Sequence, residues 1–166
     1  MKSIAIVGKA HSGKTTFAGF CGFNVVRFAE PLYAVNRALG IPKNRELMQE
    51  FSDLVKKHFG GDFFLNSFRD ALPYMLSVNL VCDDVRYETE LRFLKEQGWY
   101  LVFIDCEDCI RHERAKALGM TFNDDHSSES GVSELRGMCD LYINNGHLSL
   151  EDFKKIAEEV ARSVSI

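Results

Sequence analysis

A phosphate-loop motif is the feature that most constrains how this chain can fold. The segment 8–15 reads GKAHSGKT and fits the pattern G-x-x-x-x-G-K-[ST], directly after the apolar run Ile4–Val7. The motif works only where a buried strand ends in a tight loop that opens a helix, because backbone N–H groups then converge on an anion at the positive end of the helix dipole. The segment therefore predicts a strand–loop–helix unit that binds a nucleoside triphosphate, rather than a glycine-rich turn with a chance lysine.

The positions of this loop carry different expected tasks. Lys14 should reach the β- and γ-phosphates, and the hydroxyl of Thr15 should ligate Mg²⁺. Gly8 and Gly13 suit positions where a side chain would block the phosphate or where φ is positive. The residues expected to bind ATP in this segment are Gly8, Lys9, His11, Ser12, Gly13, Lys14, Thr15 and Thr16.

Size and charge exclude several classes of protein. A chain of 166 residues fits one domain with a real core. A formal net charge of −4 argues against a general affinity for nucleic-acid polymers, which usually requires a basic surface. No stretch approaches the roughly 18 apolar residues of a membrane span, and the first apolar run is too short for a signal peptide. We expect a cytoplasmic protein that binds neither membranes nor nucleic-acid polymers.

Short apolar runs alternate with helical patterns along the chain. Strands are expected at about 2–7, 24–28, 79–82, 99–105 and 141–143. Helices are expected at about 13–22, 31–39, 45–59, 63–76, 88–97, 107–118, 132–138 and 150–163, with N-caps at Asn44, Asp62 and Ser149 and a kink at Pro73. Near-continuous apolar strands between helices indicate a parallel sheet covered on both faces. The prediction is a five-stranded doubly wound α/β domain with ligands at the carboxyl ends of its strands.

An acidic pair marks the end of the predicted strand 79–82. An acid at the end of a buried strand beside the phosphate-loop strand is the usual carboxylate on the Mg²⁺ side, and we assign this role to Asp84, although the sequence does not distinguish it from Asp83. Arg86 follows directly, and its guanidinium could hold a substrate phosphate through two hydrogen bonds. The alternative is an Asp pair that only terminates the strand.

Two arginines on the helix 107–118 are candidates for charge neutralisation. Arg111 and Arg114 are three residues apart, so they share one helix face, and the polar segment 120–131 follows them. We interpret 107–131 as a short lid whose arginines offset charge on the transferred phosphoryl group and whose closure excludes water. The alternative is a solvated surface helix.

The cysteines allow a weaker metal hypothesis. Cys106, Cys109 and His112 have a spacing that could hold part of a zinc site, with His126 as a fourth ligand. A second CxxC motif is missing from the sequence, so we expect reduced thiols without metal.

In this order, the motifs resemble those of the phage-type deoxynucleoside monophosphate kinases of the P-loop kinase superfamily. The similarity extends over nearly the whole chain and rests on the segments 8–15, 28–32, 44–49, 84–90, 125–129 and 140–146. The phosphate loop is shared with many proteins, whereas D-V-R-[FY]-x-x-E and H-x-S-E are much narrower patterns.

The resemblance implies ATP and Mg²⁺ as cofactors, an acceptor-binding helical region at about 30–76, and a location in the host cytoplasm if the protein is phage-encoded. A homodimer is a possible assembly. Asp84 would stand beside Mg²⁺ with Thr15, and Asn145 would lie in the loop that packs on adenine. Together with the residues singled out above, the expected catalytic residues are Lys14, Asp84, Arg86, Arg111 and Arg114. The implied acceptor-binding residues are Glu30, Arg45, Gln49, Arg86, His126 and Glu129.

Some positions depart from the family pattern. Tyr33 stands where the family often has Lys, and Lys56 and Lys57 stand where relatives often carry Arg. These differences leave the acceptor base open.

The expected reaction is transfer of the ATP γ-phosphate to a nucleoside monophosphate to give a diphosphate. The acceptor is an ionised phosphate, so positioning and charge neutralisation suffice without a strong general base. Two alternatives stay open: a kinase for another small acceptor, such as dephospho-coenzyme A or phosphomevalonate, and a nucleotide-binding regulatory module without efficient transfer.

Overall fold

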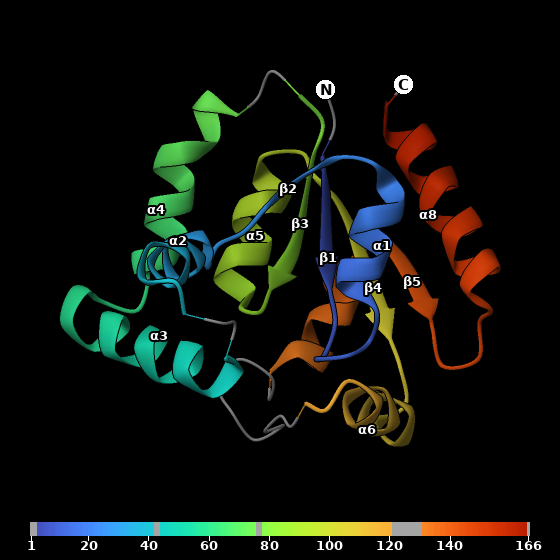
Figure 1. Cartoon of the computed structure of the whole chain (residues 1–166). Coiled ribbons are helices and arrows are strands. Elements are labelled where there is room, and N and C mark those ends of the chain that lie inside the picture. Colours follow the sequence, from blue (N-terminus) through green and yellow to red (C-terminus); the bar gives the residue numbers. More distant parts are fainter. Residues whose placement is uncertain (1–2, 42–43, 76–77, 121–130, 166) are drawn as a thin grey trace.

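A parallel five-stranded sheet forms the centre of the molecule (Figure 1). The computed structural model describes residues 3–41, 44–75, 78–120 and 131–165. The strands β1 (Ile4–Val7), β2 (Asn24–Val26), β3 (Leu80–Val85), β4 (Tyr100–Asp105) and β5 (Leu141–Asn144) are ordered β2-β3-β1-β4-β5, and all neighbours are parallel. The predicted α/β sheet is therefore confirmed.

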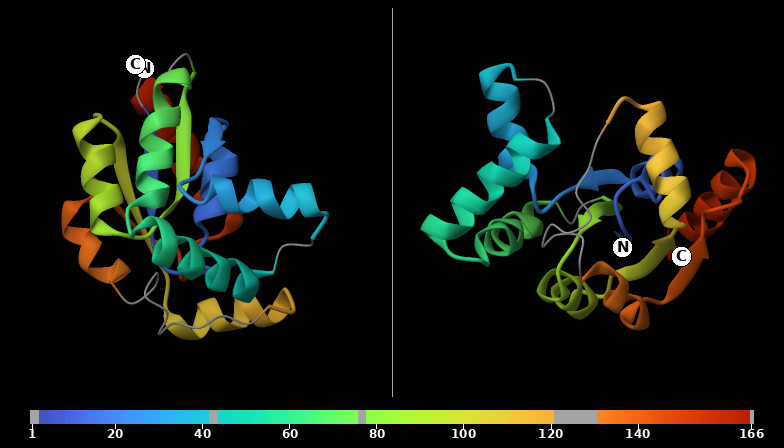
Figure 2. Two further views of the ribbon diagram at one scale, coloured as in Figure 1. Left: turned by 90° about the vertical axis from the view of Figure 1, so that its left-hand side faces the viewer. Right: turned by 90° about the horizontal axis from the view of Figure 1, so that it is seen from below.

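Alternate residues of the buried strands face two separate cores, as the pleat of a strand requires. Ile4 and Ile6 of β1 pack with α1 (Lys14–Cys21) and α8 (Leu150–Ser165) on one face. Ala5 and Val7 belong to the other core, which includes residues of α4 (Phe63–Ala71), α5 (Glu88–Glu96) and the 3-10 helix η2 (Val132–Met138). Figures 1 and 2 show these layers. Within the described ranges, no helix has the length and apolar character needed to cross a membrane.

The connection between β2 and β3 carries a helical region on one side of the sheet's carboxyl edge. It consists of α2 (Glu30–Leu39), α3 (Arg45–Phe59), α4 and the 3-10 helix η1 (Leu72–Tyr74). The predicted N-cap of α3 is confirmed, since the side chain of Asn44 accepts the backbone N–H of Leu47 at 3.1 Å. Seen from below, α3 and α6 (Asp108–Ala117) lie on opposite sides of this edge (Figure 2).

Two predicted details at the ends of α4 are wrong. Asp62 precedes the helix, but its side chain makes no capping hydrogen bond. The α-helix ends at Ala71 instead of continuing through a kink, and Leu72–Tyr74 forms a 3-10 turn. Pro73 explains the change, because it has no N–H to continue the helical hydrogen bonds and its ring clashes with the preceding turn.

An irregularity in β3 lies beside the phosphate-loop strand. Ala5 pairs with Cys82 and Val7 pairs with Val85, so β3 has one more residue than β1 over this interval. Asp83 and Asp84 are the two residues opposite Ile6. Such bulges redirect side chains near functional sites, and this one lies at the carboxyl edge where ligands are expected.

Phe68 joins α4 to the core of the sheet. The centroid of its buried ring lies 4.3 Å from that of Phe28, and the ring packs edge-on against Phe93 and Trp99.

We predict that Phe68→Ala lowers the free energy of unfolding by about 3–5 kcal/mol, because it removes the ring and leaves a cavity. Denaturant unfolding followed by the fluorescence of Trp99, the only tryptophan, measures this change. The control is Tyr74→Ala, at a side chain that is 89% exposed, and it should change the value by less than about 0.5 kcal/mol. Equal effects of the two variants would contradict this role of Phe68.

Candidate active site

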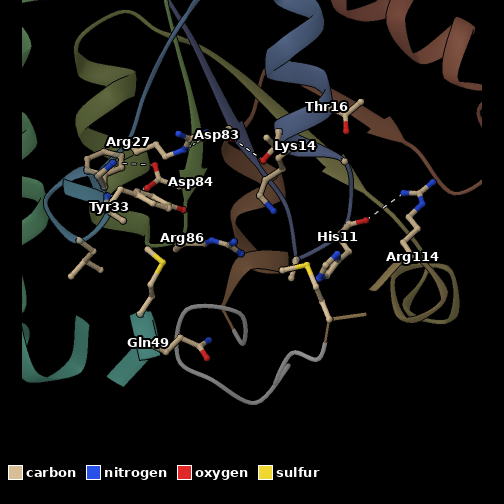
Figure 3. Close-up of a pocket in the computed structure, with 18 of the residues that line it drawn as sticks. His11, Lys14, Thr16, Arg27, Tyr33, Gln49, Asp83, Asp84, Arg86 and Arg114 are labelled. Carbon is tan, nitrogen blue, oxygen red and sulfur yellow. Dashed lines mark hydrogen bonds and ion pairs between the residues drawn. The ribbon is translucent and has the colours of Figure 1, made fainter. Parts of the chain in front are cut away.

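A cavity of about 800 Å³ opens at the carboxyl edge of the sheet. Its lining comes from the phosphate loop, the start of α2, α3 and the end of β3. In Figure 3, Lys14 and Arg86 point into this space from the phosphate loop and from the segment after β3. The arrangement brings the predicted triphosphate-binding motif and the predicted substrate arginine into one cavity.

Both glycines of the phosphate-loop motif are required by the local backbone and its neighbours. Gly8 has φ +153°, and a Cβ there would lie 2.2 Å from the carbonyl oxygen of Ile104. Gly13 has φ +108°, and its Cβ would lie 2.4 Å from Nδ2 of Asn145. The predicted positive φ is confirmed, and the close approach of neighbouring groups adds a second reason for glycine.

Lys14 lies inside the loop it belongs to. Its Nζ donates to the carbonyl oxygens of Gly8 at 2.6 Å and Lys9 at 2.7 Å, and the side chain is buried. The ammonium group is therefore held where a phosphate bound by the loop would lie. Thr15 and Thr16 also line the cavity, whereas Ser12 is buried and Lys9 pairs with Asp108 at 3.6 Å.

The two acids of β3 contact different parts of the cavity. Oδ2 of Asp83 accepts the Thr15 hydroxyl at 2.8 Å, so Asp83 is the carboxylate on the phosphate-loop side. Asp84 accepts the backbone N–H groups of Phe28 and Ala29, both at 3.0 Å. Burial raises the pKa of Asp84, while the hydrogen bond from Ala29 opposes the rise.

These contacts distinguish the two acids and favour Asp83 over Asp84 as the carboxylate on the Mg²⁺ side. Side chains alternate along a strand, and the Sγ of Cys82 lies 3.2 Å from Oδ1 of Asp84, so these two residues share the face that turns away from the phosphate loop. The carboxylate of Asp84 is occupied by the backbone at the start of α2. The position beside Thr15 belongs to Asp83.

Arg27 is a site residue that the sequence analysis missed. Its Nε donates to Oδ1 of Asp83 at 2.8 Å, and its Nη2 donates to Oδ2 at 3.1 Å. The residue follows β2, whose Val26 pairs with Cys82, so Arg27 comes directly opposite Asp83. The strand order is needed to see this, because the sequence does not say that β2 lies beside β3.

A buried glutamate shapes the segment that presents Arg86. Oε2 of Glu90 accepts the backbone N–H groups of Arg86 at 2.8 Å and Tyr87 at 3.1 Å. Burial raises the pKa of Glu90 to about 7. From α3, Lys56 donates to the hydroxyl of Tyr87 at 2.8 Å and lies 4.4 Å from the centre of its ring, which connects α3 to the same segment.

The two predicted lid arginines contact the phosphate loop. Arg111 is 0% exposed, donates to the carbonyl oxygen of Ala10 at 3.0 Å and pairs with Asp108. Arg114 lines the cavity and donates to the carbonyl oxygens of Asn145 at 2.8 Å and His11 at 3.4 Å (Figure 3).

Arg111 does not line the described cavity, because α6 packs against the phosphate loop and its buried guanidinium donates to the carbonyl oxygen of Ala10; its action on the transferred phosphoryl group stays a prediction. Arg111 and Arg114 lie on one face of α6, as predicted, and this face packs against the phosphate loop. The rest of the predicted lid, residues 121–130, lies outside the described residues, and with it His126 and Glu129.

Asn145 supports the phosphate loop from the end of β5. Its Nδ2 donates to the carbonyl oxygen of Ser12 at 2.8 Å, and the residue is buried at the cavity wall. This contact also explains why Gly13 cannot carry a side chain. The predicted packing of Asn145 on adenine stays a prediction.

The residues predicted to bind the acceptor lie in different places relative to the cavity. Gln49 lines the cavity from α3. Glu30 is exposed at the start of α2, pairs with Arg37 at 2.7 Å and is absent from the described cavity lining, so its contact with the acceptor stays a prediction. It begins the helix whose other face carries Leu32 and Tyr33 into the lining. Arg45 begins α3, but its side chain lies outside the described residues.

The cysteine hypothesis has no support from the described part of the chain. Cys106 is buried and Cys109 is exposed. Among the described residues, no three His, Cys, Asp or Glu side chains are grouped so that they could hold a metal ion. His126, the suggested fourth ligand, lies outside this part.

Comparison with solved structures identifies the fold. Shikimate kinase from Aquifex aeolicus aligns with a TM-score of 0.59 and 15% identity, covering 97% of this chain and 96% of that one. Deoxyadenosine kinase from M. mycoides, solved with dCMP and dCDP as products, aligns with a TM-score of 0.56 and 12% identity, covering 98% and 100%. The chain has the P-loop kinase fold.

Sequence comparison gives one similar curated protein at a significant level. A protein of Acanthamoeba polyphaga mimivirus named "Putative deoxynucleotide monophosphate kinase" is 24% identical over 191 residues, covering 92% of each chain. No protein-family model matches. The kinase relatives support an ATP-dependent phosphotransferase.

The raised pKa of Glu90 predicts a pH dependence of stability. Burial raises the pKa of the Glu90 carboxyl from its ordinary value of 4.5 to about 7, so the folded state binds more protons than the unfolded chain between these pH values. Stability from Glu90 is therefore present at low pH and decreases as the pH rises through this range. We predict that the stability difference between wild type and Glu90→Gln shifts toward the variant by about 3 kcal/mol from about pH 4.5 to about pH 8.

Denaturant unfolding at several pH values measures this shift. Glu88→Gln is the matched control, because Glu88 lies on the same helix with an exposed side chain paired to Arg92. A difference for Glu90→Gln that stays constant with pH, or that shifts toward wild type, would contradict the raised pKa.

Proposed function

We propose that this protein is a deoxynucleoside monophosphate kinase that transfers the γ-phosphate of ATP to the phosphate of its acceptor. The observation that carries the proposal is that Lys14 of the phosphate loop and Arg86 line the same cavity. It supplies positive charge for two phosphate groups at once, as transfer from one nucleotide to another requires. The similar mimivirus protein supports the same acceptor class.

The donor half is built from the phosphate loop and Asp83. Thr15 and Asp83 bring a hydroxyl and a carboxylate within 2.8 Å of each other, and such oxygen groups fit Mg²⁺, which keeps several waters and takes its other ligands from substrate phosphates. When bound, Mg²⁺ offsets charge on the β- and γ-phosphates. Lys14 would contact the same phosphates, and Asn145 and Arg111 would keep the loop in shape through its carbonyl groups.

The acceptor half lies between Arg86 and the helical region 30–76. Leu32, Met48 and Phe64 give this side of the cavity apolar walls, and Tyr33 and Gln49 add polar groups. A nucleobase matches such a lining, because its faces are apolar and its edges carry hydrogen-bonding groups. Arg86 would hold the acceptor phosphate in line with the donor.

Catalysis in this arrangement relies on position and charge. Lys14 and Arg86 would neutralise the donor and acceptor phosphates, which otherwise repel each other. Arg114 borders the same cavity and would act on the donor side. An ionised acceptor phosphate needs no base, so the buried Glu90 acts by holding the backbone of Arg86 and Tyr87.

Other acceptors are the main competing hypothesis. The fold also occurs in shikimate kinase, so it does not by itself select a nucleotide. Dephospho-coenzyme A and phosphomevalonate kinases are further candidates. A nucleotide-binding regulatory module would use the donor half alone.

An acceptor panel with γ-labelled ATP tests the proposed function. We expect label in the diphosphate of at least one deoxynucleoside monophosphate, with kcat/KM about 100-fold above that for shikimate, dephospho-coenzyme A or phosphomevalonate. Lys14→Ala should reduce turnover by roughly 100-fold or more with the fold intact by circular dichroism. Preference for a non-nucleotide acceptor would overturn the acceptor assignment, and ATP turnover that no acceptor accelerates would favour the regulatory module.

A further inference from the structure

The ion pair between Arg27 and Asp83 occupies the carboxylate that is proposed for the metal side. Both carboxylate oxygens take part: Oδ1 accepts Nε at 2.8 Å, and Oδ2 accepts Nη2 at 3.1 Å. Oδ2 also accepts the Thr15 hydroxyl. The Asp83 side chain is only 2% exposed, so water screens this pair weakly and each charge strongly affects the other.

Arg27 is held in place by more than the acid. Its guanidinium carbon lies 5.3 Å from the centre of the Tyr33 ring, and the residue follows β2, next to β3 in the sheet. Figure 3 shows Arg27 and Tyr33 grouped around Asp83 and Asp84. The acidic pair raises the pKa of Arg27 against the effect of burial, so the guanidinium stays charged.

The balance of charge around this carboxylate disfavours a free cation. The positive charge of Arg27 balances the negative charge of Asp83, and Lys14 and Arg86 add further positive charge to the same cavity. Among the described lining residues, the other acids are Asp84 and Glu90, and burial raises the pKa of each carboxyl. A divalent cation without phosphates would meet an already neutralised carboxylate among lysine and arginine side chains.

We propose that Arg27 is an internal counter-ion of Asp83 that prevents the nucleotide-free site from binding free divalent cations. The site then accepts metal together with the triphosphate, whose negative charges outweigh those of the surrounding cations. The longer contact, from Nη2 to the oxygen shared with Thr15, is the one that metal entry would weaken. The shorter contact to Oδ1 and the Tyr33 ring keep Arg27 beside Asp83. This inference rests on the metal site in the proposed function.

Binding of Mn²⁺ to the nucleotide-free protein tests the inference without any phosphoryl transfer. Electron paramagnetic resonance of free Mn²⁺ gives the bound fraction in wild type, Arg27→Gln, Arg27→Lys and the double variant Arg27→Gln/Asp83→Asn. Arg27→Gln should bind Mn²⁺ about ten-fold or more tightly than wild type, because the competing positive charge is gone. Arg27→Lys keeps that charge and should stay close to wild type. The added affinity should disappear in the double variant.

A second titration, with a non-hydrolysable ATP analogue present, checks that the effect belongs to free metal. Wild type and Arg27→Gln should then bind Mn²⁺ within about three-fold of each other, since the phosphates supply most of the attraction. Arg27→Met, which keeps an aliphatic stem beside Tyr33, replaces Arg27→Gln if circular dichroism shows that the latter is unfolded.

Three results would overturn the proposal: no gain in Mn²⁺ affinity without Arg27, a gain that survives loss of Asp83, or the same gain with the nucleotide analogue present. Failure of the acceptor panel in wild type would instead reject the proposed function. The two outcomes are separate because the Mn²⁺ titration uses no acceptor.

Discussion

Two adjacent carboxylates on β3 connect the phosphate loop to the start of the helical region between β2 and β3. Asp83 accepts the hydroxyl of Thr15, and Asp84 accepts the backbone N–H groups of Phe28 and Ala29. The residues are joined by one peptide bond, so the distance between the two halves of the cavity is set by a rigid strand rather than by mobile loops. Their placement depends on the extra residue of β3 opposite Ile6.

The buried charges around this pair are satisfied by specific partners. Arg27 forms a two-pronged ion pair with Asp83, and Glu90 accepts two backbone N–H groups next to Arg86. Burying a charged group without partners is costly, so these contacts determine where the loops around the cavity can lie. Hydrogen bonds also connect the surrounding helices to these groups. The N-cap residue of α2 bonds to Asp84 at the end of β3, α3 bonds to the segment after β3, and α6 bonds to the phosphate loop.

Local sequence patterns were sufficient for the order of strands and helices and for the phosphate loop, but they misplaced the cap and the end of α4. The apolar strands alternate with helices, and Gly8 and Gly13 lie where their backbone requires them. The contacts of Asp83 and Arg27 were not predictable, because they depend on an irregular strand register and on the neighbouring position of β2. The contact of Arg111 was not predictable either, because only the packing of α6 shows that its guanidinium meets the phosphate loop.

The central claim is that Asp83 serves the ATP side of the cavity and Asp84 the acceptor side. Separate measurements of ATP-analogue binding and acceptor binding in variants of these two residues test it most directly. Isothermal titration calorimetry would measure a non-hydrolysable ATP analogue with Mg²⁺ and, independently, the best acceptor nucleotide. Asp83→Asn should weaken the ATP analogue about ten-fold and leave the acceptor near wild type, whereas Asp84→Asn should weaken the acceptor and leave the ATP analogue near wild type. The reverse pattern, or equal loss of both ligands in both variants, would contradict the account.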